Sequence, residues 1–300
     1  MQKFGIDISV WQKGFDFDKA KAEGVEYALL RGAYHMSKDK CFEDFYAACK
    51  ERNIPVGVYL YSMAKTVAQA KNEAEALIAA VLRGKQFEYP IYIDVEDKVQ
   101  RALGKDLLTN IIIAFCETLE KAGYYAGIYS TASFLSSYTH ESKLYRFDKW
   151  IAQWSKKCSY TGDYGMWQFG GETNLLRSNK VAGVVCDQDY ALKDYPAIIK
   201  GLGLNGFGGE SIDDKMSATE KEVEGYTMNM RNLKRGSRGE DVRALQILLA
   251  GRGYNGKMNK PDGIFGPNTE GAVKLYQKAK GLAVDGIAGP KTLGELLGSK

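Results

Sequence analysis

The chain has 300 residues, of which 45% are hydrophobic, enough for one large α/β core beside a small second module. Its five scattered cysteines form no CxxC pair and its two histidines are isolated, so we expect no disulfide framework, no metal and no cofactor. A run of about 18 apolar residues is missing, which argues against membrane insertion. The N-terminal residues lack the apolar segment of a signal peptide, so we expect synthesis in a cytoplasm.

Strand-like apolar runs alternate with helix-forming stretches through the first 130 residues, which indicates five β/α units and a parallel sheet. After Ser130, three further strand-like runs follow one another through short, turn-rich connections. The eight runs cover residues 4–8, 27–31, 55–61, 90–96, 124–130, 150–154, 165–169 and 181–186. Eight strands with five helical crossovers predict an α/β fold, a TIM-like (β/α)5β3 barrel over residues 1–200.

The rest of the chain divides into a linker and a small helical domain. Residues 201–232 begin rich in glycine and continue acidic, which is typical of a flexible linker. In residues 233–300, Asp262-Gly-Ile-Phe-Gly-Pro-Asn-Thr269 is echoed by Asp285-Gly-Ile-Ala-Gly-Pro-Lys-Thr292. Each copy predicts a tight turn with proline at a helix start. Together with the apolar pattern of residues 242–249, they predict a small all-α three-helix domain.

Positive charge is concentrated in this C-terminal region. Residues 231–300 hold 13 Lys and Arg against 6 Asp and Glu, a net charge of +7, whereas the remaining residues carry −3 of the total of +4. A basic segment indicates an anionic partner, either nucleic acid or a bacterial wall that carries anionic polymers. Since no nucleic-acid-binding motif accompanies the charge, we expect no nucleic-acid partner.

Polar and aromatic residues are concentrated where the predicted strands end. In parallel barrels the active site lies at the carboxyl ends of the strands. Carboxylates can cleave a glycosidic bond, aromatic faces can stack on sugar rings, and the composition of these ends therefore indicates a carbohydrate site. The candidates are Asp7, Arg31, Tyr34, Tyr61, Asp94, Glu96, Tyr129, Trp154, Gln168 and Asp187.

Asp94 and Glu96 form the most informative pair. Two residues apart on a strand, they project from the same side with Cα atoms about 6.6 Å apart. Mutual repulsion raises the pKa of one of them, as a general acid near neutral pH requires. Each candidate also has a structural alternative: the pair could be a strand entering a polar loop, Asp7 could cap a turn, and Trp154 could fill the barrel.

Several of these motifs, taken in order, resemble glycoside hydrolase family 25, the Chalaropsis-type lysozymes found in many phage endolysins. The resemblance covers residues 1–200 and rests on Asp7-Ile-Ser9 with Trp11-Gln12, Asp94-Val-Glu96, Trp154, Trp167-Gln168 and Asp187. One departure concerns the last motif, Val-Cys-Asp-Gln-Asp-Tyr190, where the family pattern is closer to Val-Asp-x-Asn/Asp. Asp187 matches the first acidic place, and Asp189 then fills the second polar place.

The C-terminal region carries a second resemblance. Residues 233–297, with Gly236-Ser-Arg-Gly-Glu-Asp-Val-Arg-Ala-Leu-Gln246 and the two Asp-Gly-Ile turns, resemble the three-helix peptidoglycan-binding module often attached to such enzymes. Two independent resemblances that imply one substrate, bacterial peptidoglycan, support each other.

The family resemblance implies cleavage of the β-1,4 bond between N-acetylmuramic acid and N-acetylglucosamine with net retention. Glu96 would be the acid/base, while Asp94 would either attack as nucleophile or steady the substrate's own acetamide. Asp7 and Asp187 would hold the charge and hydrogen bonds of the site. Strand spacing leaves the mechanism open, because rotamer choice reaches both of the carboxylate separations that distinguish retention from inversion.

Three classes of function follow. The first is a muramidase with a wall-targeting tail, in the setting of a phage endolysin that accumulates in the host cytoplasm and reaches the wall after release. The second is a non-catalytic wall-binding protein, which the presence of all four acidic positions disfavours. The third is a chitinase-like hydrolase, whose longer aspartate series would need an acid where Tyr92 stands. The sequence carries no signal for an oligomeric state.

Overall fold

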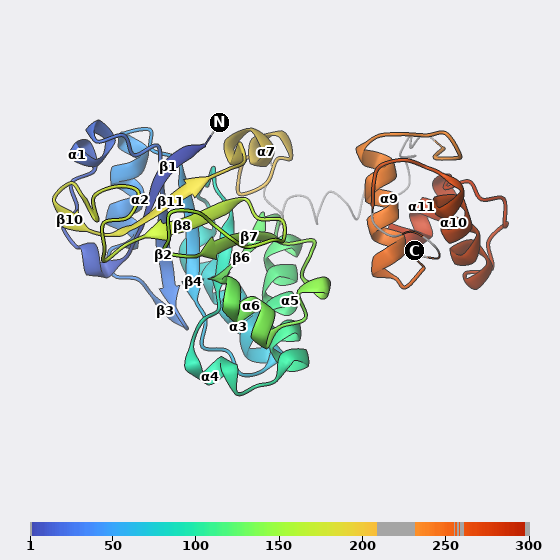
Figure 1. Cartoon of the computed structure of the whole chain (residues 1–300), viewed down its shortest axis with the longest axis horizontal. Helices are drawn as coiled ribbons and strands as arrows, with labels where there is room; N and C mark the ends of the chain where they lie inside the picture. Colours follow the sequence, from blue (N-terminus) through green and yellow to red (C-terminus); the bar gives the residue numbers. More distant parts are fainter. Residues whose placement is uncertain (1, 209–231, 255, 257, 259–260, 298–300) are drawn as a thin grey trace. The chain divides into compact units, whose positions relative to one another are not determined.

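Eight strands of the N-terminal unit, Met1–Ser217, close into a barrel in the computed structural model (Figure 1). The structure describes residues 2–208, 232–254, 256, 258 and 261–297. The sheet closes because β1 pairs with both β11 and β2. Around the barrel the strands are β1 (Lys3–Ile8), β11 (Asp187–Ala191), β8 (Met166–Gly170), β7 (Asp148–Ala152), β6 (Ala126–Thr131), β5 (Ile91–Asp94), β4 (Val56–Tyr61) and β2 (Tyr27–Tyr34). The short β3 (Ser37–Lys38) extends β2 by antiparallel pairing.

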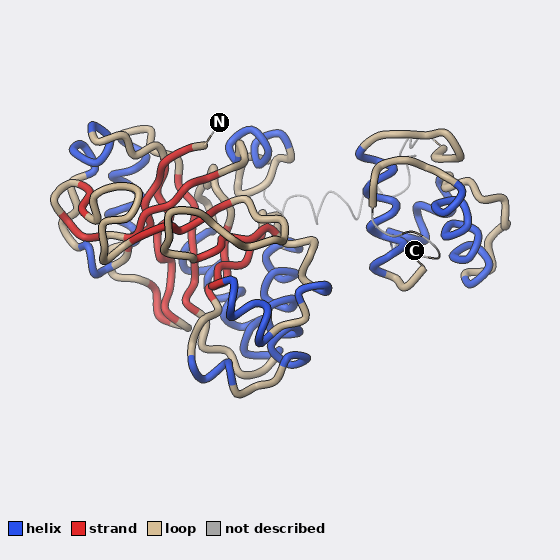
Figure 2. Tube along the Cα trace, viewed as in Figure 1, coloured by secondary structure: helices blue, strands red, loops and turns tan. Residues whose placement is uncertain are grey.

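Helices connect the first six barrel strands and pack along the outer side of the sheet, as Figure 2 shows. Three of them begin where the sequence offers a capping side chain: Asp16, Thr66 and Thr131 each accept a hydrogen bond from a backbone N–H of the first turn. The expected (β/α)5β3 arrangement is confirmed. The crossover helices are α1 (Phe17–Ala22), α2 (Phe42–Glu51), α3 (Val67–Leu77) with a π-helical turn (Ile78–Leu82), α5 (Lys105–Lys121) and α6 (Ala132–Tyr138), with the short α4 (Lys98–Arg101) before α5 and α7 (Tyr195–Gly201) after β11.

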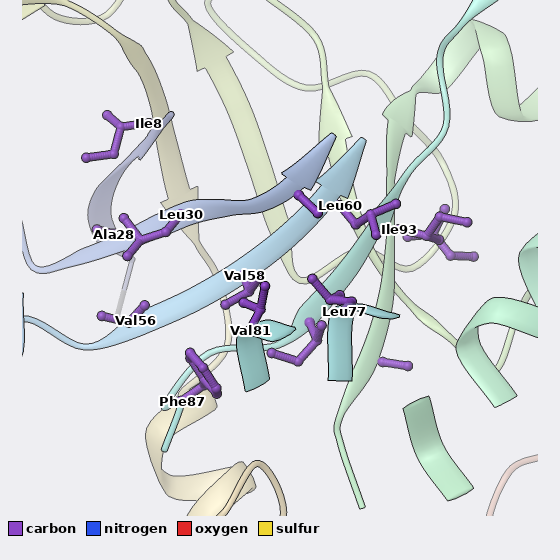
Figure 3. Packing of buried hydrophobic residues seen from close by; sticks show 14 of the residues in the cluster. Ile8, Ala28, Leu30, Val56, Val58, Leu60, Leu77, Val81, Phe87 and Ile93 are labelled. Carbon is purple, nitrogen blue, oxygen red and sulfur yellow. The ribbon is translucent and has the colours of Figure 1, made fainter. Parts of the chain in front are cut away.

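The main hydrophobic core lies between the sheet and these helices. Alternate residues of β4, such as Val58, meet Leu77 and Val81 of the segment that follows it (Figure 3). The contact is close because β2 carries Gly32, whose Cβ would lie 2.6 Å from Val58 Cγ1. A second cluster, rich in aromatic rings, includes Trp150. The aromatic side chains of this cluster therefore pack together from several different barrel strands.

The last barrel strand differs from the expected one. Residues 181–186 form no barrel strand, because the left-handed backbone of Ala182 and Gly183 turns the chain into a two-stranded hairpin of β9 (Lys180–Val181) and β10 (Val184–Val185). The barrel is closed by β11, which runs antiparallel to both β1 and β8. The start of β11 therefore lies at the edge where the parallel strands end, and Asp187 pairs with Asp7.

The barrel unit also extends beyond the expected boundary at residue 200. Asn205 is buried, accepts a hydrogen bond from Tyr125 N at 2.7 Å and donates to Phe87 O and Tyr89 O. The first residues of the expected linker 201–232 are therefore part of the barrel unit, because one side chain satisfies three backbone groups of neighbouring loops. Residues 209–231 of that linker lie outside the described residues. No helix in the described ranges is long and apolar enough to cross a membrane.

The C-terminal unit shows the three helices expected from its repeat: α9 (Glu240–Gly251), α10 (Pro267–Ala279) and α11 (Pro290–Leu297). The prolines of both Gly-Pro turns stand at the starts of α10 and α11. The helices share a core of small and branched apolar residues with Phe265 and Tyr276. The predicted all-α domain is confirmed for these residues.

A buried glutamine organises each repeat of this domain. Gln277 Nε2 donates to Asp285 Oδ1, Ile287 O and Thr292 Oγ1, and its Oε1 accepts from Gly286 N. Gln246 makes the equivalent bonds to Asp262, Ile264 O, Thr269 and Gly263 N. The repeated Asp-Gly-Ile turn is therefore held by a side chain of the helix that precedes it.

We predict that Gln277→Leu destabilises this domain. The substitution keeps the side-chain volume but leaves the amide of Gly286 without its acceptor and removes the donor to the hydroxyl of Thr292. The free energy of unfolding should therefore fall by about 2–3 kcal/mol. Amide hydrogen exchange in residues 261–297 of the full chain measures the loss. Lys278→Leu, at an exposed position on the same helix, is the control. Equal protection in the two variants would contradict the prediction.

Candidate active site

A pocket of about 230 Å³ opens at the barrel edge where the parallel strands end and β11 begins. Eight of the ten candidates taken from the sequence line it. The lining consists of Asp7, Ser9, Trp11, Gln12, Arg31, Tyr59, Tyr61, Asp94, Glu96, Tyr129, Trp150, Gln168 and Asp187. The strand-end rule therefore located most of this pocket correctly.

The remaining two candidates lie beside the pocket. Tyr34 is about half exposed and stacks on Tyr61 with ring centroids 5.0 Å apart. Trp154 is also about half exposed and donates its Nε1–H to Gln168 Oε1 at 3.0 Å. Both therefore present an open aromatic face next to residues of the lining.

Asp94 and Glu96 both reach the pocket, although β5 ends at Asp94 rather than at Glu96. The chain beyond the strand still follows β6, because Val95 N donates to Tyr129 O at 3.1 Å. The two carboxylates consequently share one side, as their spacing predicts. Asp94 is buried, and its Oδ1 has no hydrogen-bond partner among the described residues, whereas Glu96 is partly exposed.

Burial dominates the electrostatics of this pair. It raises the pKa of Asp94 well above its ordinary value, with a further increase from the charge of Glu96 and an opposing effect of Arg31. Burial also raises the pKa of Glu96, helped by Asp97 and opposed by Arg101. Raised pKa values keep a proton available in the site closer to neutral pH, which is what a general acid needs.

A second group of carboxylates faces the pocket from β1 and β11. Burial raises the pKa of Asp187 to about 6, and the charges of Glu96 and Glu172 add to the increase. Burial, followed by the charges of Asp187 and Asp189, raises the pKa of Asp7 well above its ordinary value. The pocket therefore favours the protonated form of several of its acids.

Asp189 was not among the candidates. It is fully buried, and its Oδ1 accepts a hydrogen bond from Trp150 Nε1 at 2.7 Å. Its spacing from Asp187 was the available signal, because residues two apart on a strand share a face, as for Asp94 and Glu96. The prediction missed this signal because it placed the last strand at residues 181–186, which end before Asp187.

Gln168 links the aromatic wall to the carboxylates. Its Oε1 accepts hydrogen bonds from Tyr129 Oη and Trp154 Nε1, both at 3.0 Å. The amide nitrogen is therefore left to donate, and it does so to Asp7 Oδ2 at 2.8 Å. The two donors, Tyr129 and Trp154, thus fix the orientation of the Gln168 amide, and this amide in turn orients Asp7.

Arg31 is held by Asp39, a residue that the strand-end pattern did not identify. Asp39 Oδ2 accepts from both Nε and a terminal nitrogen of Arg31 at 2.8 Å, and it also accepts from Val10 N. Because Asp39 is buried, this ion pair fixes the guanidinium in the pocket wall. Trp11, which follows Val10, is 80% exposed at the pocket edge and offers a further aromatic face.

Other lining residues have roles that the sequence did not assign. Ser9 and Gln12 form a capping box that shapes the turn after β1, while Tyr59 and Trp150 contact each other edge to face inside the barrel. Only the tertiary packing shows that Tyr59 and Trp150 line the pocket, since their sequence context is that of ordinary core aromatics.

Within the described ranges, no group of three His, Cys, Asp or Glu side chains is arranged to hold a metal ion.

Asp187 gives a pH-dependent stability prediction. Because its pKa of about 6 exceeds the ordinary 3.8, the folded protein holds this proton more tightly than the unfolded chain does. Its contribution to stability is therefore present below about pH 4 and is lost as the pH rises to about 6. Asp187→Asn removes the ionised form, so the variant should exceed the native protein in free energy of unfolding by about 1–2 kcal/mol at pH 7.

Denaturant unfolding at pH 4 and pH 7 measures this difference. Glu75→Gln is the control, since Glu75 is exposed and is not one of the charges that raise the pKa of Asp187. A stability difference between Asp187→Asn and the native protein that is the same at both pH values would contradict the assignment.

The fold and the pocket together define a class of protein. Acid side chains at the carboxyl ends of barrel strands, walled by aromatic rings and hydrogen-bonding amides, are the equipment of a glycoside hydrolase. The family model of glycosyl hydrolases family 25 matches residues 6–176, and the chain belongs to this family. The model of a putative peptidoglycan binding domain matches residues 238–296.

Individual relatives agree with this division. The chain is 25% identical over 292 residues to an autolytic lysozyme of Clostridium acetobutylicum, covering 97% of this chain and 77% of that protein. It is 52% identical over 64 residues to a zinc D-Ala-D-Ala carboxypeptidase of Streptomyces albus G, a match that covers 21% of this chain and spans only 25% of that relative. Among solved structures, the CTP1L endolysin has the same fold, with a TM-score of 0.58, 22% identity, and coverage of 66% of this chain and 70% of its own.

Proposed function

We propose that this protein is a muramidase that cleaves the β-1,4 bond between N-acetylmuramic acid and N-acetylglucosamine in bacterial peptidoglycan. The observation that carries the proposal is the convergence of Asp7, Asp94, Glu96 and Asp187 in one pocket of a family 25 barrel. A peptidoglycan-binding domain in the same chain supports the choice of substrate.

Glu96 is the proton donor in this proposal. It is the more exposed member of the pair with Asp94, so it can reach the oxygen of a bound glycosidic bond, and its raised pKa supports the protonated form. After the bond breaks, the same carboxylate accepts a proton from the attacking water. The reaction then proceeds with net retention of the anomeric configuration.

Asp94 assists the anomeric carbon in one of two ways. It either attacks as nucleophile, or it accepts a hydrogen bond from the substrate's acetamide as the acetamide oxygen closes on that carbon. Its buried Oδ1, which lacks a protein partner among the described residues, is suited to either contact. Asp7 and Asp187 supply hydrogen bonds and charge around the sugar, and Arg31 limits the net negative charge.

The sugar rings are held by aromatic and polar groups at the pocket edge. Tyr34 stacked on Tyr61 forms one open aromatic surface, and Trp154 forms another beside Gln168 and Tyr129. Such faces pack against the apolar side of a pyranose ring, while the amide and hydroxyl groups meet its polar substituents.

Mass spectrometry of the products from a panel of purified walls tests the proposal. Muramidase action leaves products with a reducing N-acetylmuramic acid end. Products from chitin oligomers but not from walls would indicate a chitinase-like hydrolase instead. Binding to walls without any turnover would indicate a non-catalytic wall-binding protein.

The C-terminal domain targets the enzyme to the wall in this proposal, and its net charge of +7 over residues 231–300 suits anionic wall polymers. Residues 1–208 alone should keep their turnover on soluble glycan fragments, because every residue of the pocket lies in the barrel unit. They should bind insoluble walls more weakly than the full chain in a sedimentation assay. Equal binding would assign the C-terminal domain another role.

The biological setting we propose is host lysis by a phage endolysin that acts on the wall after release from the host cytoplasm. Similarity to an autolytic lysozyme makes a bacterial autolysin the competing setting. Expression in the host with and without a membrane-permeabilising agent separates the two, since an endolysin lyses cells only once the membrane is opened.

A further inference from the structure

A second pocket, of about 180 Å³, lies beside the candidate active site. We call it the Arg101 pocket; it is lined by Arg101, Thr131, Ser133, Phe134, Ser137 and Tyr138. Its walls come from α4, which follows Glu96 by two residues, and from the end of β6 with α6. The charge of Arg101 opposes the rise in the pKa of Glu96, as expected for a cation five residues away on the adjoining helix. None of its lining residues lines the pocket of the candidate active site.

The composition of the Arg101 pocket suits a short acidic peptide. Phe134 and Tyr138, with ring centroids 5.0 Å apart, provide an apolar floor for methyl groups. Arg101 lies with its Cζ 5.8 Å from the centroid of the Phe134 ring, so a cation–π contact positions the guanidinium. The side chains of Ser133 and Ser137 are exposed and add hydroxyl groups.

The cation itself is available for a ligand. Among the described residues, no carboxylate forms an ion pair with Arg101. The nearby Asp97 is already engaged, because its Oδ1 accepts from Val99 N at 2.8 Å and its Oδ2 accepts from Tyr61 Oη at 2.9 Å. A guanidinium with free donors is well suited to a carboxylate.

A cation beside the acidic pocket of the candidate active site affects how an anionic substrate binds there. A peptidoglycan substrate carries a peptide stem on the lactyl group of each N-acetylmuramic acid, and the stem contains carboxylates and alanine methyl groups. Those of Asp7, Asp94, Glu96 and Asp187 that are ionised repel these carboxylates as the glycan approaches. Arg101, a cation beside Glu96, offsets that repulsion on one side of the site only. This asymmetry also orients the bound glycan strand.

We propose that the Arg101 pocket binds the acidic peptide stem of the substrate. The inference rests on the proposed muramidase function and adds to it a preference for glycan that carries stems. The stem's carboxylate meets Arg101, and its alanine methyl groups lie on Phe134 and Tyr138.

The test compares kcat/KM on one batch of soluble glycan strands before and after an amidase removes the stems. The native protein should prefer the stem-bearing strands. Arg101→Gln should reduce kcat/KM on them roughly fivefold, mainly through KM, the effect of a partly exposed ion pair of about 1 kcal/mol. On the stem-free strands the loss should be much smaller, because Arg101 acts there only through its charge on Glu96.

Three further variants sharpen this comparison. Lys98→Gln removes one charge from the same helix outside the pocket and should behave as the native protein. Arg101→Lys keeps the charge and should retain part of the preference. Ser137→Trp fills the pocket and should abolish the preference without a change on stem-free strands. Thermal unfolding confirms that each variant is folded.

Several results would overturn the proposal. An equal loss on both substrates, with a shifted pH profile, would mean that Arg101 acts only on the pKa of Glu96. If Lys98→Gln and Arg101→Gln lowered kcat/KM on stem-bearing strands equally, Arg101 would act only as one more positive charge on the helix and not as part of a binding pocket. A preference that disappears when anionic polymers, but not stems, are removed from the substrate would assign the pocket to those polymers.

A failure of the proposed function is distinguishable from these results. If the native protein turns over neither substrate, the muramidase proposal fails, and binding of the Glu96→Gln variant to stem-bearing and stem-free strands then decides the pocket's role. Tighter binding of stem-bearing strands, lost in the Glu96→Gln, Arg101→Gln double variant, supports the proposal. Equal binding of both strands overturns it.

Discussion

Replacing Glu96 with glutamine should abolish the release of reducing ends from purified peptidoglycan, with a fall in kcat of about 1,000-fold or more. The amide has nearly the same shape but cannot donate an acidic proton to the leaving oxygen or accept one from water. Because Glu96 lies at the pocket surface and makes no hydrogen bond that supports the fold in the described structure, the variant should keep its thermal stability.

The control for this prediction is Glu172→Gln. Glu172 is exposed, lies close enough to affect the pKa of Asp187, and does not line the pocket. This variant should turn over walls normally, and both variants should bind walls as the native protein does. Normal turnover by Glu96→Gln would exclude it as the acid and transfer that role to another carboxylate of the pocket.

Replacing Asp94 with asparagine should lower kcat by about 100- to 1,000-fold. The substitution removes a negative charge beside the anomeric carbon, where positive charge develops in the transition state. The kcat of the variant on purified peptidoglycan, measured beside that of the native protein, records the loss.

Two measurements distinguish the roles of Asp94. A 2-fluoro glycoside should attach covalently to Asp94 if this residue is the nucleophile, and mass spectrometry of a peptide containing it detects the adduct. Glycan from which the N-acetyl groups have been removed should instead resist cleavage if the acetamide participates. Unchanged kcat in Asp94→Asn would contradict both roles.

The sequence predicted the barrel well because its strands are specified locally. Apolar runs alternate with helix-forming stretches, so this pattern alone locates the five β/α units. In the structure, Asp16, Thr66 and Thr131 cap three of the helices. The eighth strand was misplaced because residues 181–186 are apolar but fold into a hairpin. The left-handed backbone at Ala182 and Gly183 decides this turn.

The candidate site was predicted less completely than the barrel. Residues at strand ends were found, since topology brings those ends together, and this applies to Asp7, Asp94 and Glu96. Asp39 was not found, because the pattern of a single sequence does not show its ion pair with Arg31. Asp189 was missed because the last strand was placed before Asp187, although the two-residue spacing indicated a shared face, and its contact with Trp150 joins distant strands.

The order and spacing of local motifs thus determined the fold class, the helical domain with its two turns, and the acid pair Asp94 and Glu96. These features depend on neighbours in the chain, where backbone periodicity and turn chemistry act. Only the tertiary structure decided which acids share the pocket, how Gln168 orients Asp7, and why the pKa values rise. Burial and long-range hydrogen bonds cause these effects, and both arise only when distant strands close the barrel.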